Sequence, residues 1–286
     1  MPSSTVPPAA ERHPAAPSSP DPVEALVRRS LAGERDAVEA LVRALQPLVF
    51  RLAVRILWRR EDAEDATQEI LVRVVTRLSQ FDFQSRLETW IYRVATNYLI
   101  DVKRSCVEQA ELTFDKFAAD LVDGLDDTGP TEAERSILTE EVKIGCTLGM
   151  LQCLDRPHRL AYVLGEILEL PAPEAAHALD LEPAAFRKRL QRAREAIEAF
   201  TRAHCGLVSD AAPCRCHRRV AAAVRLGRVQ ADALVFAAEG ASFVGVRALI
   251  RRVEHAKWTI ATQRTNDPTC RIDIVQRVVS ALDPGV

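Results

Sequence analysis

The sequence contains few aromatic residues and little glycine, and it has no long uncharged apolar segment. Aromatic residues make up 5% of the 286 residues, and there are 11 glycines. No region alternates apolar and polar residues between turn signals, so the sequence predicts an all-α protein. No apolar run approaches the roughly 20 residues of a membrane span, and no hydrophobic segment follows Met1 as in a signal peptide. We therefore expect a soluble, cytoplasmic protein without membrane insertion.

Disulfide bonds are not expected either. The seven cysteines are an odd number, and without a secretory signal the thiols are expected to be reduced. The net charge of −2 is unusual for a protein that binds only DNA, but it conceals local asymmetry. Acidic residues gather in 61–69 and 108–134, whereas basic residues gather in 187–194 and 215–228. This arrangement predicts one basic partner and one polyanionic partner.

The N-terminal part of the chain changes character near residue 23. Residues 1–22 are rich in proline, serine and alanine, which predicts a disordered tail. A short helix is expected from Val23 to Ala32, and the longer helix after it has a broad apolar face that is typical of a bundle. Pro47 falls inside the longer pattern, where it is expected to bend the helix or begin a new one.

Residues 61–104 combine three different surfaces. Five acids stand between Glu61 and Glu69, and the apolar residues that follow at helical spacing predict an amphipathic helix. A loop around Phe81 separates this helix from a second amphipathic one. The second helix carries polar and aromatic side chains off its apolar face, namely Trp90, Arg93, Asn97 and Arg104.

This stretch resembles region 2 of a bacterial RNA polymerase sigma factor of the extracytoplasmic-function (ECF) type. The resemblance is carried by Asp65-Ala66-Thr67-Gln68-Glu69, by Phe81, and by Trp90-Ile91-Tyr92-Arg93-Val94-Ala95-Thr96-Asn97. In that family the acidic helix docks on the largest subunit of the polymerase, and opposite charge steers such an association. The resemblance implies a core-polymerase-binding set of Asp65, Gln68, Glu69 and Arg73. Judged on charge alone, such a run is more often a solvated helix face.

The same resemblance implies that the second helix recognises the −10 promoter element. Extruding a base from the duplex costs a few kcal/mol, and stacking on aromatic or arginine side chains returns roughly 1–3 kcal/mol per base. The implied −10 contacts are Trp90, Arg93, Asn97, Lys103 and Arg104. For Trp90, a position in the core is an equally good interpretation.

A second candidate DNA-binding unit follows an acidic segment. Residues 106–138 contain many acids together with glycine and proline, which predicts a flexible acidic linker. Helical periodicity returns near Thr139. Residues 173–200 then have the proportions of a helix-turn-helix: a short helix ends near Leu179, and Glu182-Pro183 begins a longer one with an apolar stripe.

Basic and amide side chains lie off that stripe, as readout in a major groove requires. They are Arg187, Lys188, Gln191, Arg192 and Arg194. The segment is similar to region 4 of the same family, including its ending Arg192-Ala193-Arg194-Glu195-Ala196-Ile197, which implies recognition of the −35 element. Taken alone, a basic helix of this length is more often a solvated face. The two resemblances divide the chain into region 2 (23–105), the linker and region 4 (139–203).

The chain continues as an extension over 204–286, with short helices predicted at 220–226, 231–238, 244–253 and 272–282. Cys205, Cys214 and Cys216, with His204 or His217, are candidate zinc ligands, because tetrahedral zinc takes four thiolates or imidazoles. The C-x-C spacing is tighter than that of a standard finger, and small buried thiols are common. A structural staple, a metal sensor and no metal at all therefore stay open, and a regulatory role for the extension is a hypothesis from its position.

Together these features predict a sigma factor, a non-catalytic subunit that directs promoter-specific initiation at −10 and −35 elements. The expected partners are core RNA polymerase, promoter DNA and an anti-sigma factor, and no cofactor is required beyond a candidate zinc ion in the extension. The alternatives are a stand-alone helix-turn-helix regulator and a metal-responsive sigma factor gated by its Cys/His tail. A zinc deaminase is disfavoured, since Pro213-Cys214-Arg215-Cys216 is one residue short of P-C-x-x-C and no H-x-E exists.

Overall fold

The computed structural model describes residues 22–102, 112–126, 132–229, 270 and 274–282. Residues 1–21 of the predicted tail, residues 106–111 and 127–131 of the predicted linker, and the helices expected at 231–238 and 244–253 lie outside these residues. Within the described part of the chain every regular element is helical, and the one β-type contact is an isolated bridge between Cys205 and Cys214. The all-α prediction is therefore confirmed. No described helix is long and apolar enough to cross a membrane.

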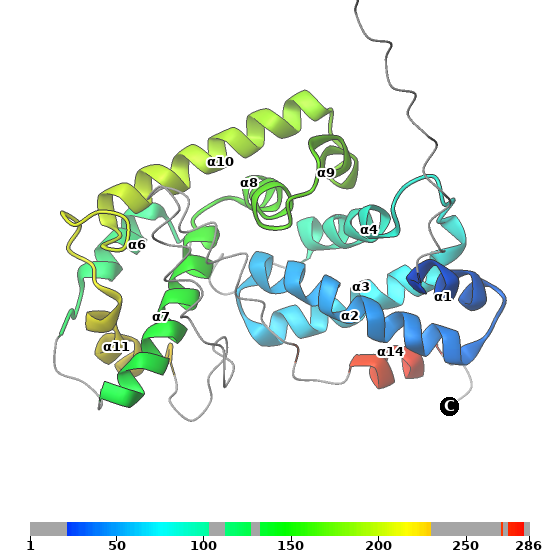
Figure 1. The fold of residues 1–286 in the computed structure, drawn as a ribbon, viewed down its shortest axis with the longest axis horizontal. Coiled ribbons are helices and arrows are strands. Elements are labelled where there is room, and N and C mark those ends of the chain that lie inside the picture. The colour runs from blue at the N-terminus through cyan, green and yellow to red at the C-terminus, as the bar shows by residue number, and fades with distance from the viewer. Residues whose placement is uncertain (1–21, 103–111, 127–131, 230–269, 271–273, 283–286) are drawn as a thin grey trace, which may run out of the picture.

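The first four α-helices form a bundle (Figure 1). They are α1 (Pro22–Leu31), α2 (Arg35–Leu57), α3 (Arg60–Thr76) and α4 (Leu87–Asp101), with a short 3₁₀ turn, η1 (Leu78–Gln80), after α3. The apolar stripes predicted from the sequence face one another, since Leu41, Leu52, Ile70 and Ile91 are all fully buried. This burial is what holds the bundle together, because short helices are stable in water mainly through the packing of their apolar faces.

Helix α2 runs through Pro47 without ending, so the expectation that a new helix could begin there is wrong. A proline inside a helix removes one backbone N–H and leaves the carbonyl four residues earlier without its partner. Here that carbonyl belongs to Arg43. Both Arg43 and Pro47 are exposed, so water can satisfy the freed carbonyl and the helix can continue.

The second half of the structure contains α6 (Phe114–Val122), α7 (Glu132–Gln152), α8 (Arg156–Tyr162), the π-helical turn η2 (Val163–Ile167), α9 (Ala172–Ala178) and α10 (Pro183–His204). Helix α6 corrects the prediction of a linker without regular structure, because Thr113 caps its N-terminus and Phe117 and Leu121 are buried. The rings of Phe114 and Phe117 lie 5.2 and 5.5 Å from the ring of Phe200 on α10. The many acids of this segment made a helix hard to predict, although its apolar residues pack on α10.

Helices α9 and α10 form the predicted helix-turn-helix. The short helix ends at Ala178 and the long one begins at Pro183, as the sequence indicated. The predicted apolar stripe of α10 is confirmed, with Phe186, Leu190, Ala193, Ile197 and Phe200 all buried. Gly165 in η2 permits this packing, because a Cβ there would lie 2.6 Å from a methyl carbon of Leu190.

Two arginines of α8 join the two halves. Arg159 is 2% exposed and donates hydrogen bonds to the carbonyls of Leu151 and Leu154, both at 2.8 Å, and to the carbonyl of Ile56 at the end of α2. Arg156 donates to the carbonyls of Leu99 and Val102 at the end of α4. Helix C-termini leave carbonyls without partners inside the helix, and cations stabilise them. These bonds fix the second half against the ends of α2 and α4.

The extension beyond α10 contributes two described helices that lie far apart in Figure 1. Helix α11 (Cys216–Arg225) packs beside α7, where Val220 and Ala223 cluster with Leu138 and Val142. Helix α14 (Ile274–Leu282) packs instead on the N-terminal bundle, against α2 and α3. They overlap the helices predicted at 220–226 and 272–282.

Candidate polymerase-binding and DNA-binding surfaces

Helix α3 carries the predicted polymerase-binding residues on more than one face. The side chains of Asp65 and Glu69 are 75% and 47% exposed. Arg73 forms an ion pair with Glu69 at 3.0 Å, and its guanidinium lies 4.7 Å from the centre of the Tyr98 ring. Gln68 differs, since its Oε1 is buried and accepts no hydrogen bond in the described part of the chain. The acidic side of the helix is therefore open to a partner, whereas the side that bears Gln68 is covered.

The loop between α3 and α4 is organised by three aromatic rings. Phe81 is buried, and its ring centre lies 4.7 Å from that of Phe83 and 5.7 Å from that of Trp90. Arg28 of α1 stacks over Phe83 at 4.1 Å. Trp90 is half-buried and packs against the core. It therefore supports the loop, as one of the two interpretations expected, and also keeps part of its ring accessible.

Helix α4 lies against α9, the first helix of the helix-turn-helix. Thr89 donates to Glu174 at 2.8 Å, and the Thr96 hydroxyl donates to the carbonyl of Ala178 at 2.6 Å. Arg93 is 3.3 Å from a ring nitrogen of His177 and 3.4 Å from Asp180. Of the predicted −10 residues, Arg93 is thus engaged within the chain, Asn97 is exposed, and Lys103 and Arg104 lie outside the described residues.

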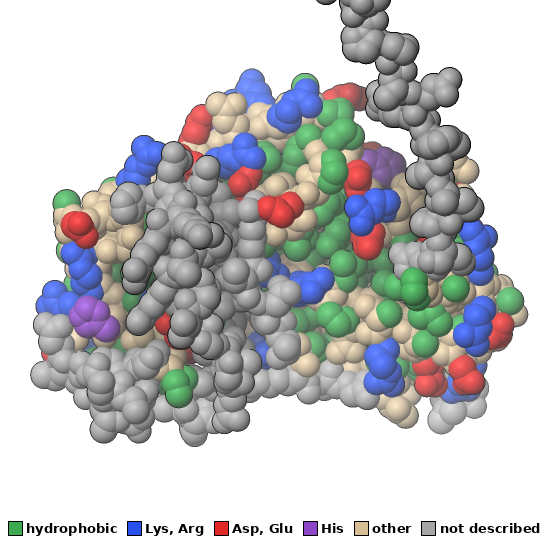
Figure 2. Space-filling model, in the orientation of Figure 1, with side chains coloured by type: hydrophobic (Ala, Val, Ile, Leu, Met, Phe, Trp, Pro, Cys, Tyr) green, Lys and Arg blue, Asp and Glu red, His purple; other side chains and the backbone are tan. Residues whose placement is uncertain are grey.

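Helix α10 presents an open basic face. All five of its predicted −35 residues are exposed: Arg187, Lys188, Gln191, Arg192 and Arg194. Gln191 donates to Glu195 at 2.8 Å. Basic side chains follow the upper edge of the molecule along this helix in Figure 2. The fifth predicted residue, Arg194, forms an ion pair with the buried carboxylate of Glu166 in η2. In this structure it therefore connects α10 to η2.

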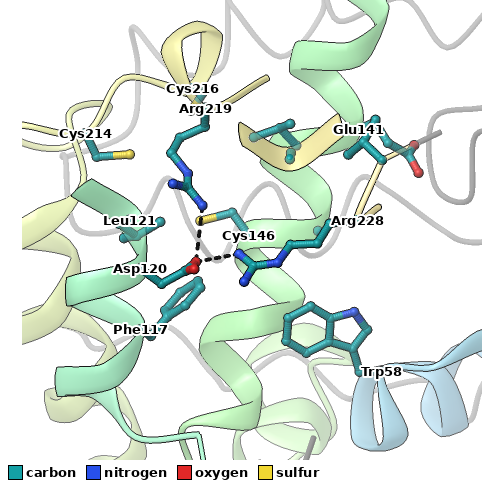
Figure 3. Close-up of a pocket in the computed structure, with 14 residues that line it drawn as sticks. Trp58, Phe117, Asp120, Leu121, Glu141, Cys146, Cys214, Cys216, Arg219 and Arg228 are labelled. Atoms are coloured by element: carbon teal, nitrogen blue, oxygen red, sulfur yellow. Dashed lines mark hydrogen bonds and ion pairs between the residues drawn. The ribbon is translucent and has the colours of Figure 1, made fainter. Parts of the chain in front are cut away.

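Four cysteines gather where α7, the end of α10 and α11 meet. Cys146, Cys214 and Cys216 line a cavity with Phe117, Asp120 and Arg219 (Figure 3), and the backbone of Cys205 forms a bridge with that of Cys214. Burial raises the pKa of Cys214 to about 11 and that of Cys216 to about 12, and the neighbouring thiols add to both shifts. Burial, with the other three thiols, holds the pKa of Cys146 well above its usual range. Burial also raises the pKa of Cys205, so all four are protonated thiols at neutral pH.

This neighbourhood differs from the metal site expected from the sequence. His204 lies 5.0 Å from the Phe200 ring, centre to centre, and His217 is exposed. Cys146 was not among the candidates, because it stands on α7 far from the tail and only the fold brings it to the other thiols. Throughout the described ranges, no three His, Cys, Asp or Glu residues converge in a way that would hold a metal ion.

The cavity has one charged cluster beside the thiols. Asp120 of α6 accepts hydrogen bonds from Arg219 at 3.2 Å and from Arg228 at 2.6 Å (Figure 3). Arg219, which is 5% exposed, also donates to the carbonyl of Asp123. The extension after α10 is thus bound to the acidic linker segment through two ion pairs, one from the buried Arg219 and one from the half-exposed Arg228.

Comparison with known proteins places these surfaces in a family. Residues 41–106, which span α2 to α4, match the model of Sigma-70 region 2. The chain is 27% identical over 177 residues to the ECF RNA polymerase sigma factor SigW of Bacillus subtilis, covering 60% of this chain and 92% of that protein. It is 29% identical over 183 residues to the ECF RNA polymerase sigma-E factor of Escherichia coli, covering 61% and 92%.

A solved structure, that of CnrH in complex with the cytosolic domain of CnrY, is 21% identical and covers 63% of this chain and 96% of that one, with a TM-score of 0.45. The acidic bundle helix, the region 2 match and the basic helix-turn-helix together define a two-module transcription protein. Residues 41–106 match Sigma-70 region 2, and about three fifths of the chain is similar to ECF RNA polymerase sigma factors. About two fifths of it lies outside the matches to these relatives.

Proposed function

We propose that this chain binds core RNA polymerase through α3 and directs initiation at promoters through α4 and α10. The observation that carries the proposal is the Sigma-70 region 2 match over α2 to α4, supported by relatives whose names are those of RNA polymerase sigma factors. Such a protein acts by binding and not by catalysis. It works where the polymerase works, in the bacterial cytoplasm.

The exposed acids of α3 support a docking role. Asp65 and Glu69 project into solvent on a helix whose first turn is also acidic. Complementary charge accelerates association and fixes the register of a complex more than it adds affinity. Arg73, held by Glu69 and Tyr98, keeps this acidic row in one arrangement.

The basic face of α10 supports −35 recognition. Arg187 and Lys188 lie near the N-terminus of the second helix of a helix-turn-helix, the end that contacts base edges in this motif. Gln191 and Arg192 follow one turn later. Arginine pairs with guanine and glutamine with adenine, while the remaining cations hold phosphates. Arg194 keeps its predicted role only if its ion pair with Glu166 breaks.

Recognition of the −10 element by α4 requires a conformational change. Arg93 engages His177 and Asp180, so a phosphate or a base would compete with these two side chains for its guanidinium. DNA binding would therefore favour a state in which α9 has moved off α4, and a ligand shifts such an equilibrium only through its preference for one state. We infer that the described arrangement is a closed form of the protein.

Zinc binding in the extension stays a proposal, with a revised ligand set. Cys146, Cys205, Cys214 and Cys216 are the four thiols that share one neighbourhood, and four thiolates suit tetrahedral zinc. Their side chains would have to turn toward one another and lose their protons. Zinc measured per purified chain tests this: a Cys146→Ser variant should lose the metal, whereas Cys153→Ser, directly after the end of the same helix, should retain it. Equal zinc in both variants would remove Cys146 from the ligand set.

Core-enzyme binding separates the sigma-factor proposal from a stand-alone helix-turn-helix regulator. We expect the purified chain to comigrate with core RNA polymerase and to bind duplex DNA weakly without it. Tight, sequence-specific binding to duplex DNA in the absence of polymerase would favour the regulator. An anti-sigma factor stays a predicted partner, to be sought by copurification from cells.

A further inference from the structure

The C-terminal helix α14 lies on the helix that we propose as the polymerase-docking element. Figure 1 shows α14 beneath the N-terminal bundle, far from α11 and the rest of the extension. Its apolar side chains are deeply buried there: Ile274 and Val278 are fully buried, and Val275 is 3% exposed. This helix therefore packs as part of the bundle core, although it follows the predicted region 4 by some seventy residues.

The contacts show which face of α3 is covered. At one end, the Cys270 sulfur lies 4.0 Å from a carboxylate oxygen of Glu64. At the other end, Val75 shares a hollow with Val279 and Leu282. Residues 64, 68 and 75 lie on one side of an α-helix, because residues three, four and seven apart are neighbours on its surface. Gln68 therefore stands between the two contacts.

Gln68 of α3 has one buried polar atom on this side of the helix. Its Oε1 is buried without a hydrogen-bond partner in the described residues, and a buried, unpaired polar atom is unfavourable. Gln68 is also one of the residues implied in polymerase binding. A partner that offers a donor to Gln68 would satisfy this atom once α14 has left, so the covered state and the bound state differ at this side chain.

The charges of the contact are complementary but weak. Arg277 carries the charge of α14 and lies 4.0 Å from Asp65, with both side chains about half or more exposed. Exposed ion pairs of this kind contribute little stability. Arg277 thus sets the register of α14 on the acidic helix, while the buried apolar residues hold it in place.

We propose that α14 is an intramolecular inhibitor that competes with core RNA polymerase for α3. The proposal rests on the assignment of α3 as the docking helix. A tethered segment has a high effective concentration at its site. When the binding-competent state is a fraction of the population, the apparent affinity falls by that fraction. An open fraction of about one tenth gives an apparent Kd about tenfold weaker than that of the uncovered chain.

The test measures the Kd for core RNA polymerase with the full-length chain, a chain ending at residue 269, and the full-length variant Val278→Asp. The matched control is Val224→Asp, the same substitution at a 43% exposed position on α11. We expect the truncated chain and Val278→Asp to bind about tenfold more tightly than the full-length chain, and Val224→Asp to bind like it. Equal affinities for all four chains, or weaker binding after truncation, would overturn the proposal.

Two further measurements keep the result interpretable. A synthetic peptide of residues 270–286 should weaken polymerase binding by the truncated chain, whereas a peptide with Val278→Asp should not. If peptide and truncation are both without effect, α14 is a structural helix only. Failure of every chain to bind polymerase would contradict the sigma-factor assignment, while equal binding by all of them would contradict only the inhibitory role of α14.

Discussion

Helices α4 and α10, which we propose to contact the two promoter elements, differ in what already touches them. The basic face of α10 is open to solvent. The corresponding face of α4 is held by α9 through Thr89, Arg93 and Thr96, and its C-terminus is capped by Arg156. The face of α10 is therefore accessible to the DNA that we propose it binds, whereas the face of α4 is partly covered by α9.

This difference arises because the two modules contact each other directly, α4 against α9. The same α9–α10 unit supplies the open helix and the cover for the closed one. Any movement that frees α4 must displace α9, and α10 moves with α9 because the two helices pack on each other. Movement of α9 and α10 away from α4 therefore also changes the distance between α4 and α10. Promoters that differ in the spacing of their two elements would favour different distances.

The largest expected effect comes from removing the hydrogen bonds of Arg159, which connect the two modules. Arg159→Met should lower the free energy of unfolding by about 3–5 kcal/mol, because it leaves several buried carbonyls without a donor. The backbone amides of α4 and α10 should then both lose protection from hydrogen exchange. Chemical unfolding checks this value. Arg202→Met, at an exposed position on α10, is the control and should change stability little, and an equally small effect of Arg159→Met would show that these hydrogen bonds are unimportant.

The open helix is tested by reversing its charge. Arg187→Glu with Lys188→Glu should weaken promoter binding by the holoenzyme roughly 100-fold, as expected for the loss of base and phosphate contacts worth about 1–3 kcal/mol each. Because both side chains are exposed, the melting temperature should hardly change. The control Arg43→Glu with Lys116→Glu alters charge equally elsewhere. Equal losses in the two double variants would mean that net charge, and not α10, binds the DNA.

The closed helix is tested at its buried hydrogen bond to α9. Thr96→Val keeps the shape of the side chain but leaves the Ala178 carbonyl without its donor, at a cost of about 1–3 kcal/mol. Hydrogen exchange should quicken in α9 and in the N-terminal half of α4. Thr201→Val is the control, since that hydroxyl only bonds carbonyls of its own helix. Unchanged exchange in α9 would show that the closed contact does not depend on this bond.

The smallest expected effect lies at the N-terminus of α8, the helix that carries Arg156 and Arg159. Asp155 caps this helix by accepting hydrogen bonds from the backbone and ring of His158 at 2.9 and 2.7 Å. Burial alone would raise the pKa of Asp155, but the bonds and charge of His158, with Arg189, outweigh it and hold the pKa below 3.8. Asp155→Ala should cost about 1 kcal/mol near pH 7.

The pH dependence of that cost follows from the sign of the shift. A carboxyl group with a lowered pKa contributes stability above its unfolded pKa, and the contribution is lost as the pH falls through the folded value. The cost of Asp155→Ala should therefore persist down to about pH 4 and shrink below it. Asp210→Ala, at an exposed position, should show no such dependence. A cost that does not shrink below about pH 4 would contradict the capping role.

The features that depend on a single helix could be predicted from the sequence. The apolar stripes of α2, α3 and α10 and the turn before Pro183 follow from periodicity and local turn chemistry, and all are confirmed. Lys188 and Arg192 were expected on an exposed face for the same reason. A stripe of apolar residues identifies the buried side of a helix, so the polar side is known as well.

The sequence was not sufficient for what depends on contacts between distant segments. Arg93 looked free, because nothing local indicates that His177 and Asp180 will reach it. Arg194 stands on the polar side of α10 but pairs with Glu166. The same limit applies to Cys146 and to the face of α3 beneath α14. Helix α6 was missed for a different reason: its acids dominate a short segment in which Phe117 and Leu121 provide the packing.

The most direct test is run-off transcription with core RNA polymerase on a library of genomic fragments. With either the full-length chain or the chain ending at residue 269, we predict discrete transcripts that core enzyme alone does not make. The transcripts should be lost when Glu69 is replaced by Lys. If neither chain yields a transcript above the level of core enzyme alone, the assignment of α3, α4 and α10 to promoter-specific initiation is contradicted.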